Sequence, residues 1–177
     1  TEKDGYMNNA VSAKLNYDLF NDFNFDVMYN YNFGKGDIDK SYQSGDDPNY
    51  TFDNEEQFIK AGINFSLFNE TWSGKISGSF MKKTSHTRDE ADEMDDSYSN
   101  SFNKADRKKI EIINNLTIMS GNILTFGFEA LEEKANTEYF SMSLWGPYES
   151  IFPEHSNSNT GLFIQDKINI ADRFFGT

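Results

Sequence analysis

The residue types best suited to holding a metal ion lie in an acidic stretch in the first third of the chain. Four aspartates there could supply oxygen ligands for Ca²⁺, which takes about six to eight of them in a complete site. Their spacing does not match the calcium-binding loop of an EF-hand, and a charged, solvated loop explains them more simply. Calcium is therefore a hypothesis, and no other cofactor is expected. The four candidates are Asp37, Asp39, Asp46 and Asp47.

Aromatic side chains in the last third of the chain form a second group of candidates, for contact with a small-molecule ligand. Aromatic rings can stack on a ligand, and binding residues concentrate on loops. Trp145 and Tyr148 flank the pair Gly146-Pro147 in the middle of a predicted long connection. Packing within that connection is an equal alternative to ligand contact. The candidates are Tyr139, Trp145, Tyr148 and Phe152.

Residues for catalysis are not evident, and we expect no enzymatic activity. The chain has no cysteine, which excludes disulfides, thiolate metal sites and a cysteine nucleophile. The two histidines, His86 and His155, lie in different predicted loops and form no zinc-binding spacing. The many carboxylates lie in acidic runs, without an apolar pocket that could separate their pKa values as acid–base catalysis requires.

The charge of the chain excludes another class of function. With 29 acidic and 16 basic residues, the formal net charge is −13. Such a charge repels nucleic acid, which binds to basic surfaces. It also argues against binding to anionic lipid headgroups by charge alone.

The elements that must position these residues are strands, because apolar residues recur with a period of two. Between Phe23 and Phe33 every second residue is apolar or aromatic, and the residues between them are mostly polar. This period is typical of a strand with one apolar face and is not compatible with a helix. The same alternation occurs in six further stretches, and an eighth strand begins near Arg173. The six stretches are 11–19, 59–67, 72–80, 110–118, 124–130 and 162–170.

The connections between these strands alternate in length. Short turns are expected near Phe20–Asp22, Asn69–Thr71, Ser120–Asn122 and Ala171–Asp172. Long connections, two of them rich in acidic residues, are expected over Gly34–Glu56, Lys82–Asp106 and Glu132–Ser158.

This arrangement predicts an all-β fold, an antiparallel up-and-down meander of about seven or eight strands. A soluble sheet would need a helix or a second sheet to cover its apolar face, and the sequence offers neither. Outer-membrane barrels face lipid instead, with short periplasmic turns and long external loops. We therefore expect an arc of an outer-membrane β-barrel, with the turns in the periplasm and the loops outside the cell.

Two stretches carry a resemblance to a known family. Leu124–Ala130 (LTFGFEA), followed after a long connection by Ser158–Asp166 (SNTGLFIQD), resembles consecutive barrel strands of TonB-dependent receptors, and Asp172–Phe174 fits the next turn. The resemblance extends over essentially the whole chain. It rests on strand patterns, so it transfers no individual ligand-binding residue.

The resemblance implies a role in uptake of a scarce ligand across the outer membrane of a Gram-negative bacterium. Such receptors have a 22-stranded barrel filled by an N-terminal plug, and they import siderophores, cobalamin or similar ligands with energy supplied through TonB. Residues 1–177 would form a single segment of the barrel, without plug or TonB box. The implied partners are an iron chelate or cobalamin-like ligand, outer-membrane lipid and, only through the plug, TonB.

Two alternatives stay open at this point. The chain could be a complete small outer-membrane barrel with an adhesive or structural role, or a soluble β-domain that binds carbohydrate through Trp145 and Tyr148. An incomplete barrel has two open sheet edges and a large apolar face. We therefore expect the isolated chain to self-associate.

Overall fold

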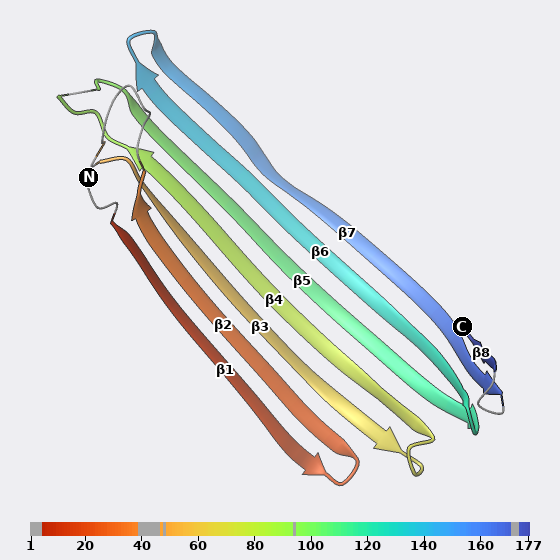
Figure 1. Ribbon diagram of the computed structural model, residues 1–177. Coiled ribbons are helices and arrows are strands. Elements are labelled where there is room, and N and C mark those ends of the chain that lie inside the picture. The colour runs from red at the N-terminus through yellow and green to blue at the C-terminus, as the bar shows by residue number, and fades with distance from the viewer. Residues whose placement is uncertain (1–4, 39–46, 48, 94, 171–173) are drawn as a thin grey trace.

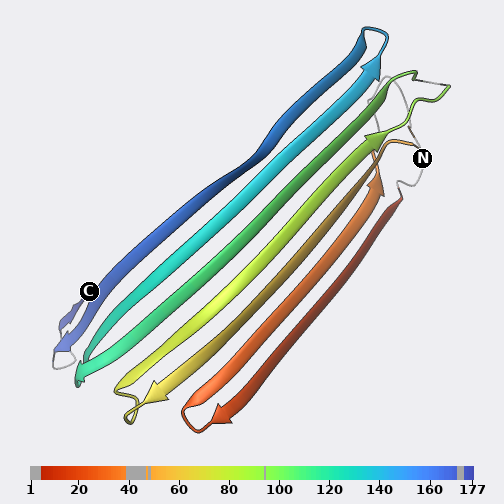
Figure 2. The same cartoon turned by 180° about the vertical axis from the view of Figure 1, so that it is seen from behind.

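The structure is a computed structural model that describes residues 5–38, 47, 49–93, 95–170 and 174–177, and it consists of one eight-stranded antiparallel sheet (Figure 1). Each strand pairs with the next strand in sequence, so β1 and β8 lie at opposite edges, as Figure 2 shows from behind. No helix in the described part is long and apolar enough to cross a membrane. The strands are β1 (Tyr6–Phe20), β2 (Phe23–Asp37), β3 (Thr51–Leu67), β4 (Trp72–Asp89), β5 (Tyr98–Met119), β6 (Asn122–Ser143), β7 (Gly146–Ile170) and β8 (Phe174–Gly176). The predicted up-and-down meander of seven or eight strands is confirmed.

The register aligns the apolar residues of neighbouring strands. Directly paired residues of antiparallel strands point to the same side of a sheet. The apolar residues of each strand therefore form continuous rows on one face, which we call the apolar face. One such row crosses seven strands and consists of Tyr17, Phe25, Ile63, Ile76, Ile112, Phe128 and Leu162.

Nothing in the described structure covers the apolar face. Among the described residues no hydrophobic side chain is buried, and Ile76 and Leu162 are 50% and 83% exposed. A soluble domain buries such side chains in a core. The apolar face is therefore suited to contact with lipid.

The opposite face, which we call the polar face, carries a network of charged and amide side chains. The Nζ of Lys75 on β4 lies 2.7 Å from Oδ1 of Asp26 on β2, and Asn64 of β3 donates a hydrogen bond to the same oxygen. Lys109 of β5 lies 2.7 Å from Glu111 and 2.8 Å from Glu129 of β6. The first group of contacts links β2, β3 and β4, and the second links β5 and β6, on the side opposite the apolar face.

The part of the apolar face in which apolar residues alternate along every strand is called the apolar belt. The apolar rows end at different heights on successive strands, so this belt is inclined to the strands. Toward the long connections, the belt ends at Phe33 on β2 and at Leu162 on β7. The register row that contains Leu162 crosses β2 at Phe25, so the two limits lie at different heights on β2. This is a shift of about 27 Å along the strands over about 24 Å across them. It corresponds to the strand tilt of roughly 45° that a transmembrane barrel requires. The intermediate limits are Ile59, Phe80, Ile110 and Ala130.

The predicted long connections are shorter than expected, because the strands continue beyond the apolar belt. The first connection shrinks to residues 38–50 and the second to residues 90–97. The third, expected over Glu132–Ser158, is wrong as a loop: β6 and β7 continue to a two-residue turn, Leu144-Trp145. Backbone pairing needs no apolar face, so loss of the alternation marks where the apolar belt ends and not where the strand ends.

Candidate functional site

The candidate site lies at the end of the sheet where the connections β2–β3, β4–β5 and β6–β7 gather (Figure 1). The hairpin of β6 and β7 supplies most of its aromatic residues. The pairing of β6 with β5 has one register shift, beside the short turn that joins the two strands, and it is regular from there to the end of β6. Side chains at every second position of β6 therefore share a face. Tyr139 lies on the polar face, because it is an even number of residues from Glu129.

Three of the four predicted aromatic residues share the polar face. The pairs Thr137–Phe152, Tyr139–Ser150 and Ser141–Tyr148 follow one another along the hairpin. The rings of Tyr139 and Tyr148 lie 6.0 Å apart, within the range of favourable aromatic pairs.

A fourth ring, His155, extends this group toward the apolar belt. It stacks on Phe152 with ring centroids 4.5 Å apart. A register shift between Ala135 and Thr137 inserts an extra residue into β7, and this places Phe152 and His155 on the same face although they are three residues apart. We call Tyr139, Tyr148, Phe152 and His155 the aromatic ladder. No sequence pattern indicates the bulge, so His155 is not among the predicted ligand contacts.

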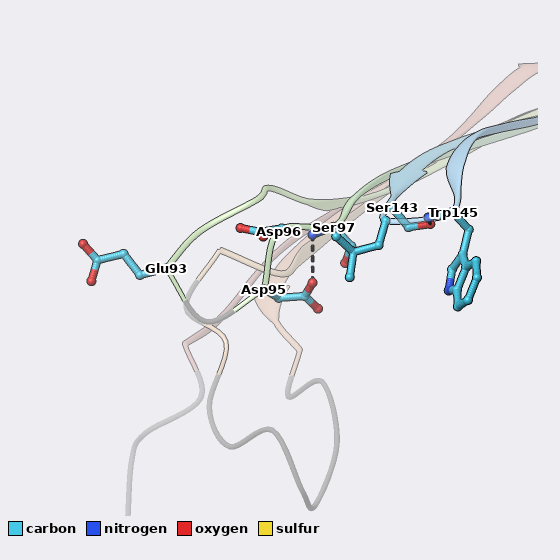
Figure 3. A pocket seen from close by; sticks show the side chains of 7 residues that line it. Glu93, Asp95, Asp96, Ser97, Ser143 and Trp145 are labelled. Atoms are coloured by element: carbon cyan, nitrogen blue, oxygen red, sulfur yellow. Dashed lines mark hydrogen bonds between the residues drawn. The ribbon is translucent and has the colours of Figure 1, made fainter.

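Trp145, the fourth predicted aromatic residue, lies apart from the ladder. It occupies the turn at the hairpin tip, where it is 98% exposed and its backbone N–H donates to Oγ of Ser143. It lines a shallow pocket of about 360 Å³ between the tip and the β4–β5 connection (Figure 3). The other lining residues are Glu93, Asp95, Asp96, Ser97, Ser143 and Leu144.

The acidic β4–β5 connection at this pocket is organised by its own hydrogen bonds. Oδ1 of Asp92 accepts from the N–H of Asp95, and Oδ1 of Asp95 accepts from the N–H of Ser97. Asn49 donates to Oδ2 of Asp92 over 3.0 Å, which connects this loop with the β2–β3 connection. In Figure 3 the carboxylate of Glu93 points away from Trp145. The pocket therefore offers one open aromatic ring beside a carboxylate-rich wall.

The predicted calcium ligands are only partly described. Asp39 and Asp46 lie outside the described residues. The Oδ2 of Asp37, at the end of β2, accepts a hydrogen bond from the N–H of Gly5, and Asp47 is 6% exposed with its Oδ1 accepting from Asn49. Within the described ranges, no three histidine, aspartate or glutamate residues form a group that could hold a metal ion.

The two histidines were predicted to lie in different loops. In the structure they lie in strands, on opposite faces of the sheet. The Nε2 of His86 lies 2.6 Å from Oδ1 of Asn100, and its Nδ1 lies 3.5 Å from Asp53. The Nδ1 of His155 lies 2.8 Å from the carbonyl oxygen of Pro153. Each histidine is held by its own neighbours, so the pair cannot act on one substrate.

Two solved structures match the chain over nearly its whole length. The ferric citrate transporter FecA in its unliganded form matches 95% of the chain with a TM-score of 0.74 and 14% identity. The ferric yersiniabactin uptake receptor FyuA from Yersinia pestis matches 97% with a TM-score of 0.66 and 8% identity. In both comparisons the chain spans 28% of the length of the solved chain.

The other comparisons identify no relative. No protein-family model matches the chain, and no curated protein matches it. At 14% and 8% identity the likeness establishes the fold and leaves the ligand open. The chain has the fold of a segment of these two solved proteins, which confirms the predicted fold class and, for the fold, the resemblance to TonB-dependent receptors.

Proposed function

We propose that the chain forms part of the wall of a TonB-dependent receptor in the outer membrane of a Gram-negative bacterium, and that this receptor takes up an iron chelate. The single observation that carries the proposal is the aromatic ladder, because its rings lie on the polar face beyond the apolar belt. In a transmembrane barrel the polar face lines the interior. We therefore expect the ligand to enter along the ladder.

The class of ligand is inferred from the two solved structures with this fold. One is a ferric citrate transporter and the other a ferric yersiniabactin uptake receptor. Both names specify an iron chelate, whereas cobalamin, which the sequence resemblance also allowed, receives no support from them. We expect Tyr139, Tyr148 and Phe152 to contact the chelate and Trp145 to meet it first at the hairpin tip.

The remaining parts of the proposal concern energy and chemistry. Transport energy would come through TonB and a plug domain that fills the barrel. The chain itself would bind its ligand without converting it, as expected of a transporter wall. Binding of calcium by Asp37, Asp39, Asp46 and Asp47 stays a prediction.

The alternatives fit the structure less well. A soluble carbohydrate-binding domain requires a covered core, and no hydrophobic side chain is buried among the described residues. A small adhesive barrel would need no aromatic residues on its interior side. The aromatic ladder therefore favours a receptor that passes its ligand inward.

The matched pairs of rings on the two faces allow a direct test. Tyr139–Tyr148 lies on the polar face, and Tyr98–Phe140, also 6.0 Å apart, lies on the apolar side of the same hairpin region. We expect Tyr139→Ala/Tyr148→Ala in the receptor to weaken binding of its chelate by roughly tenfold or more, because each lost stacking contact contributes about 1 kcal/mol. Tyr98→Ala/Phe140→Ala should change binding little.

The measurement is uptake of radioactive iron by cells under iron limitation, with ferric citrate and ferric yersiniabactin as the first two probes. Both variants must reach the outer membrane in equal amounts. Equal loss of uptake in the two double variants would show that the ladder has no special role. Iron uptake unaffected by deletion of the receptor would contradict the proposed function as a whole.

A further inference from the structure

A recess on the polar face adjoins the aromatic ladder on the side of the apolar belt. Its volume is about 340 Å³, and it lies between two neighbouring register rows of the polar face. One row contributes the small side chains of Ala105 and Ala135, which are direct partners, and ends at His155 of the ladder. Because His155 belongs to both, the ladder and the recess form one continuous surface. The other row contributes Met81, Arg107, Glu133 and Asn157.

The basic side chains of this part of the polar face lie opposite carboxylates. The Nε of Arg107 lies 3.5 Å from Oε1 of Glu133, its direct cross-strand partner, and both side chains are 46% exposed. In the row of Ala105, Lys83 lies directly opposite Glu56. Among the described residues, no other lysine or arginine lies on the polar face between these rows and the hairpin tip. The surface therefore has no excess of positive charge with which to bind an anion.

The connections beside this surface carry negative charge. The described parts of the β2–β3 and β4–β5 connections contain six carboxylates and neither lysine nor arginine. Their field repels an anionic ligand, and salt screens it only over about 8 Å at physiological ionic strength. A ligand with net negative charge is therefore disfavoured at the connections as well as in the recess. The carboxylates belong to Asp47, Glu90, Asp92, Glu93, Asp95 and Asp96.

Uncharged polar side chains supply the hydrogen-bonding groups of the same surface. Asn103 and Thr137 are direct partners in the row beside the recess, and Thr137 lies opposite Phe152 of the ladder. Ser101 lies opposite Tyr139 in the row beyond. Amides and hydroxyls donate and accept hydrogen bonds without adding charge, and the rings add apolar contact. The surface therefore fits a ligand that combines neutral polar groups with apolar segments.

We propose that the ladder and the recess bind an uncharged ferric chelate, and that Glu133 sets this preference by neutralising Arg107. The inference rests on the proposed function, because it takes an iron chelate as the ligand. A ferric trihydroxamate is a chelate of this kind, since its three hydroxamate groups balance the charge of Fe³⁺. Ferric citrate, by contrast, is an anionic complex. Glu133 is a specificity-determining residue in this proposal, because it removes the charge that an anionic chelate would need.

The experiment is isothermal titration calorimetry of the purified full-length receptor in detergent, with two chelates of one scaffold. Ferrioxamine B acetylated at its amine is uncharged, whereas the succinylated form carries one negative charge. We expect the receptor to bind the acetylated form roughly tenfold more tightly, because the succinylated form meets repulsion without a compensating cation. Equal binding of the two forms, or tighter binding of the succinylated one, would overturn the proposal.

A matched pair of variants tests the role of Glu133. Glu133→Gln leaves Arg107 without its carboxylate, so the affinity for the succinylated chelate should rise about fivefold, with little change for the acetylated one. The control is Glu132→Gln, which removes the same charge on the opposite face, where Glu132 contacts Lys108 and Lys134. It should leave the ratio of the two affinities unchanged. An equal change of this ratio in both variants would show that Glu133 has no special role.

A double variant shows whether the effect acts through Arg107. Arg107→Gln/Glu133→Gln removes both charges, so its preference for the uncharged chelate should equal that of the wild type. The ratio of affinities reports on charge and not on folding, because a merely misfolded site would lose both chelates together. A double variant that binds the succinylated chelate as well as Glu133→Gln does would contradict the role of Arg107.

Failure of this inference can be told apart from failure of the proposed function. If deletion of the receptor abolishes uptake of ferric citrate but not of ferric trihydroxamates, the inference is overturned and the proposed function stands. A receptor that imports iron but binds neither form of ferrioxamine would have the same meaning. If deletion changes the uptake of no ferric chelate, the proposed function itself is contradicted.

Discussion

Lys75 holds together the polar face on the N-terminal side of the sheet. Its Nζ contacts Asp26 across the intervening strand β3, and the side chains of both residues are less than one third exposed, at 30% and 17%. Asn64 of β3 donates to the same carboxylate oxygen. The ion pair and the amide thus fix the relative positions of three strands through one oxygen atom.

Replacing this lysine should cost stability. We expect Lys75→Met to lower the free energy of unfolding by about 1–2 kcal/mol, because the charged Asp26 then loses its ion-pair contact and keeps the hydrogen bond from Asn64. The measurement is guanidinium-induced unfolding in detergent micelles, followed by circular dichroism. Lys14→Met, on the exposed edge strand β1, is the control and should unfold as the wild type does. A similar loss in both variants would show that the contact with Asp26 contributes nothing.

At the level of single residues, the sequence predicted the identity of the aromatic candidates but not their grouping. Tyr139, Tyr148 and Phe152 were expected in a loop, where no face can be assigned. Their common face follows from the pairing of β6 with β7, and His155 joins them through a bulge that shifts the register. Trp145 was grouped with them by its neighbourhood in sequence, whereas the turn places it beside the β4–β5 connection.

At the level of strands, the period of two was sufficient to predict the sheet within the apolar belt. The seven predicted apolar stretches correspond to β1 through β7, and three of the short turns fall where they were expected, near Phe20–Asp22, Asn69–Thr71 and Ser120–Asn122. The fourth, Ala171–Asp172, lies outside the described residues. Beyond the belt both faces carry polar and aromatic residues, so the alternation disappears although the backbone pairing continues. That is why the third connection was predicted as a loop and is instead a long hairpin.

Two adjacent isoleucines of β5 test the assignment of the faces. Ile112 belongs to the apolar row that crosses seven strands, and Ile113 lies on the polar face between Lys75 and Gly127. In a lipid bilayer we expect Ile112→Lys to lower the free energy of unfolding by about 2–4 kcal/mol, because the ammonium group would face hydrocarbon. Ile113→Lys, which faces the interior, should cost much less.

The measurement is unfolding by guanidinium in lipid vesicles, with the folded fraction read from the shift of tryptophan fluorescence. Equal destabilisation of the two variants in vesicles would mean that the apolar face does not contact lipid.

At the level of the whole molecule, the sheet formed by the described residues has two unpaired edges and one uncovered apolar face. Strand β1 has a partner on one side only, and most of β7 has no partner beyond β6 because β8 pairs only with Ile168–Ile170. Free edges and apolar surfaces both promote association of chains. We therefore expect the 177-residue chain to self-associate when it is studied alone in water.

Analytical ultracentrifugation provides the test. In buffer without detergent the chain should sediment as dimers or larger species, and micelles that cover the apolar face should shift it toward smaller ones. A single monomeric species in detergent-free buffer would contradict the expectation, and with it the conclusion that the apolar face lacks a protein cover.

In the proposed receptor, the length of the β6–β7 hairpin would determine what is met first at the cell surface. From Leu162 at the limit of the apolar belt, β7 continues to Gly146, which is about 50 Å of strand and roughly 35 Å of height at a tilt of about 45°. Leu144 and Trp145 at its tip are 90% and 98% exposed. An antibody raised against this tip would need no access to the barrel interior. It could therefore label living cells without blocking the aromatic ladder below.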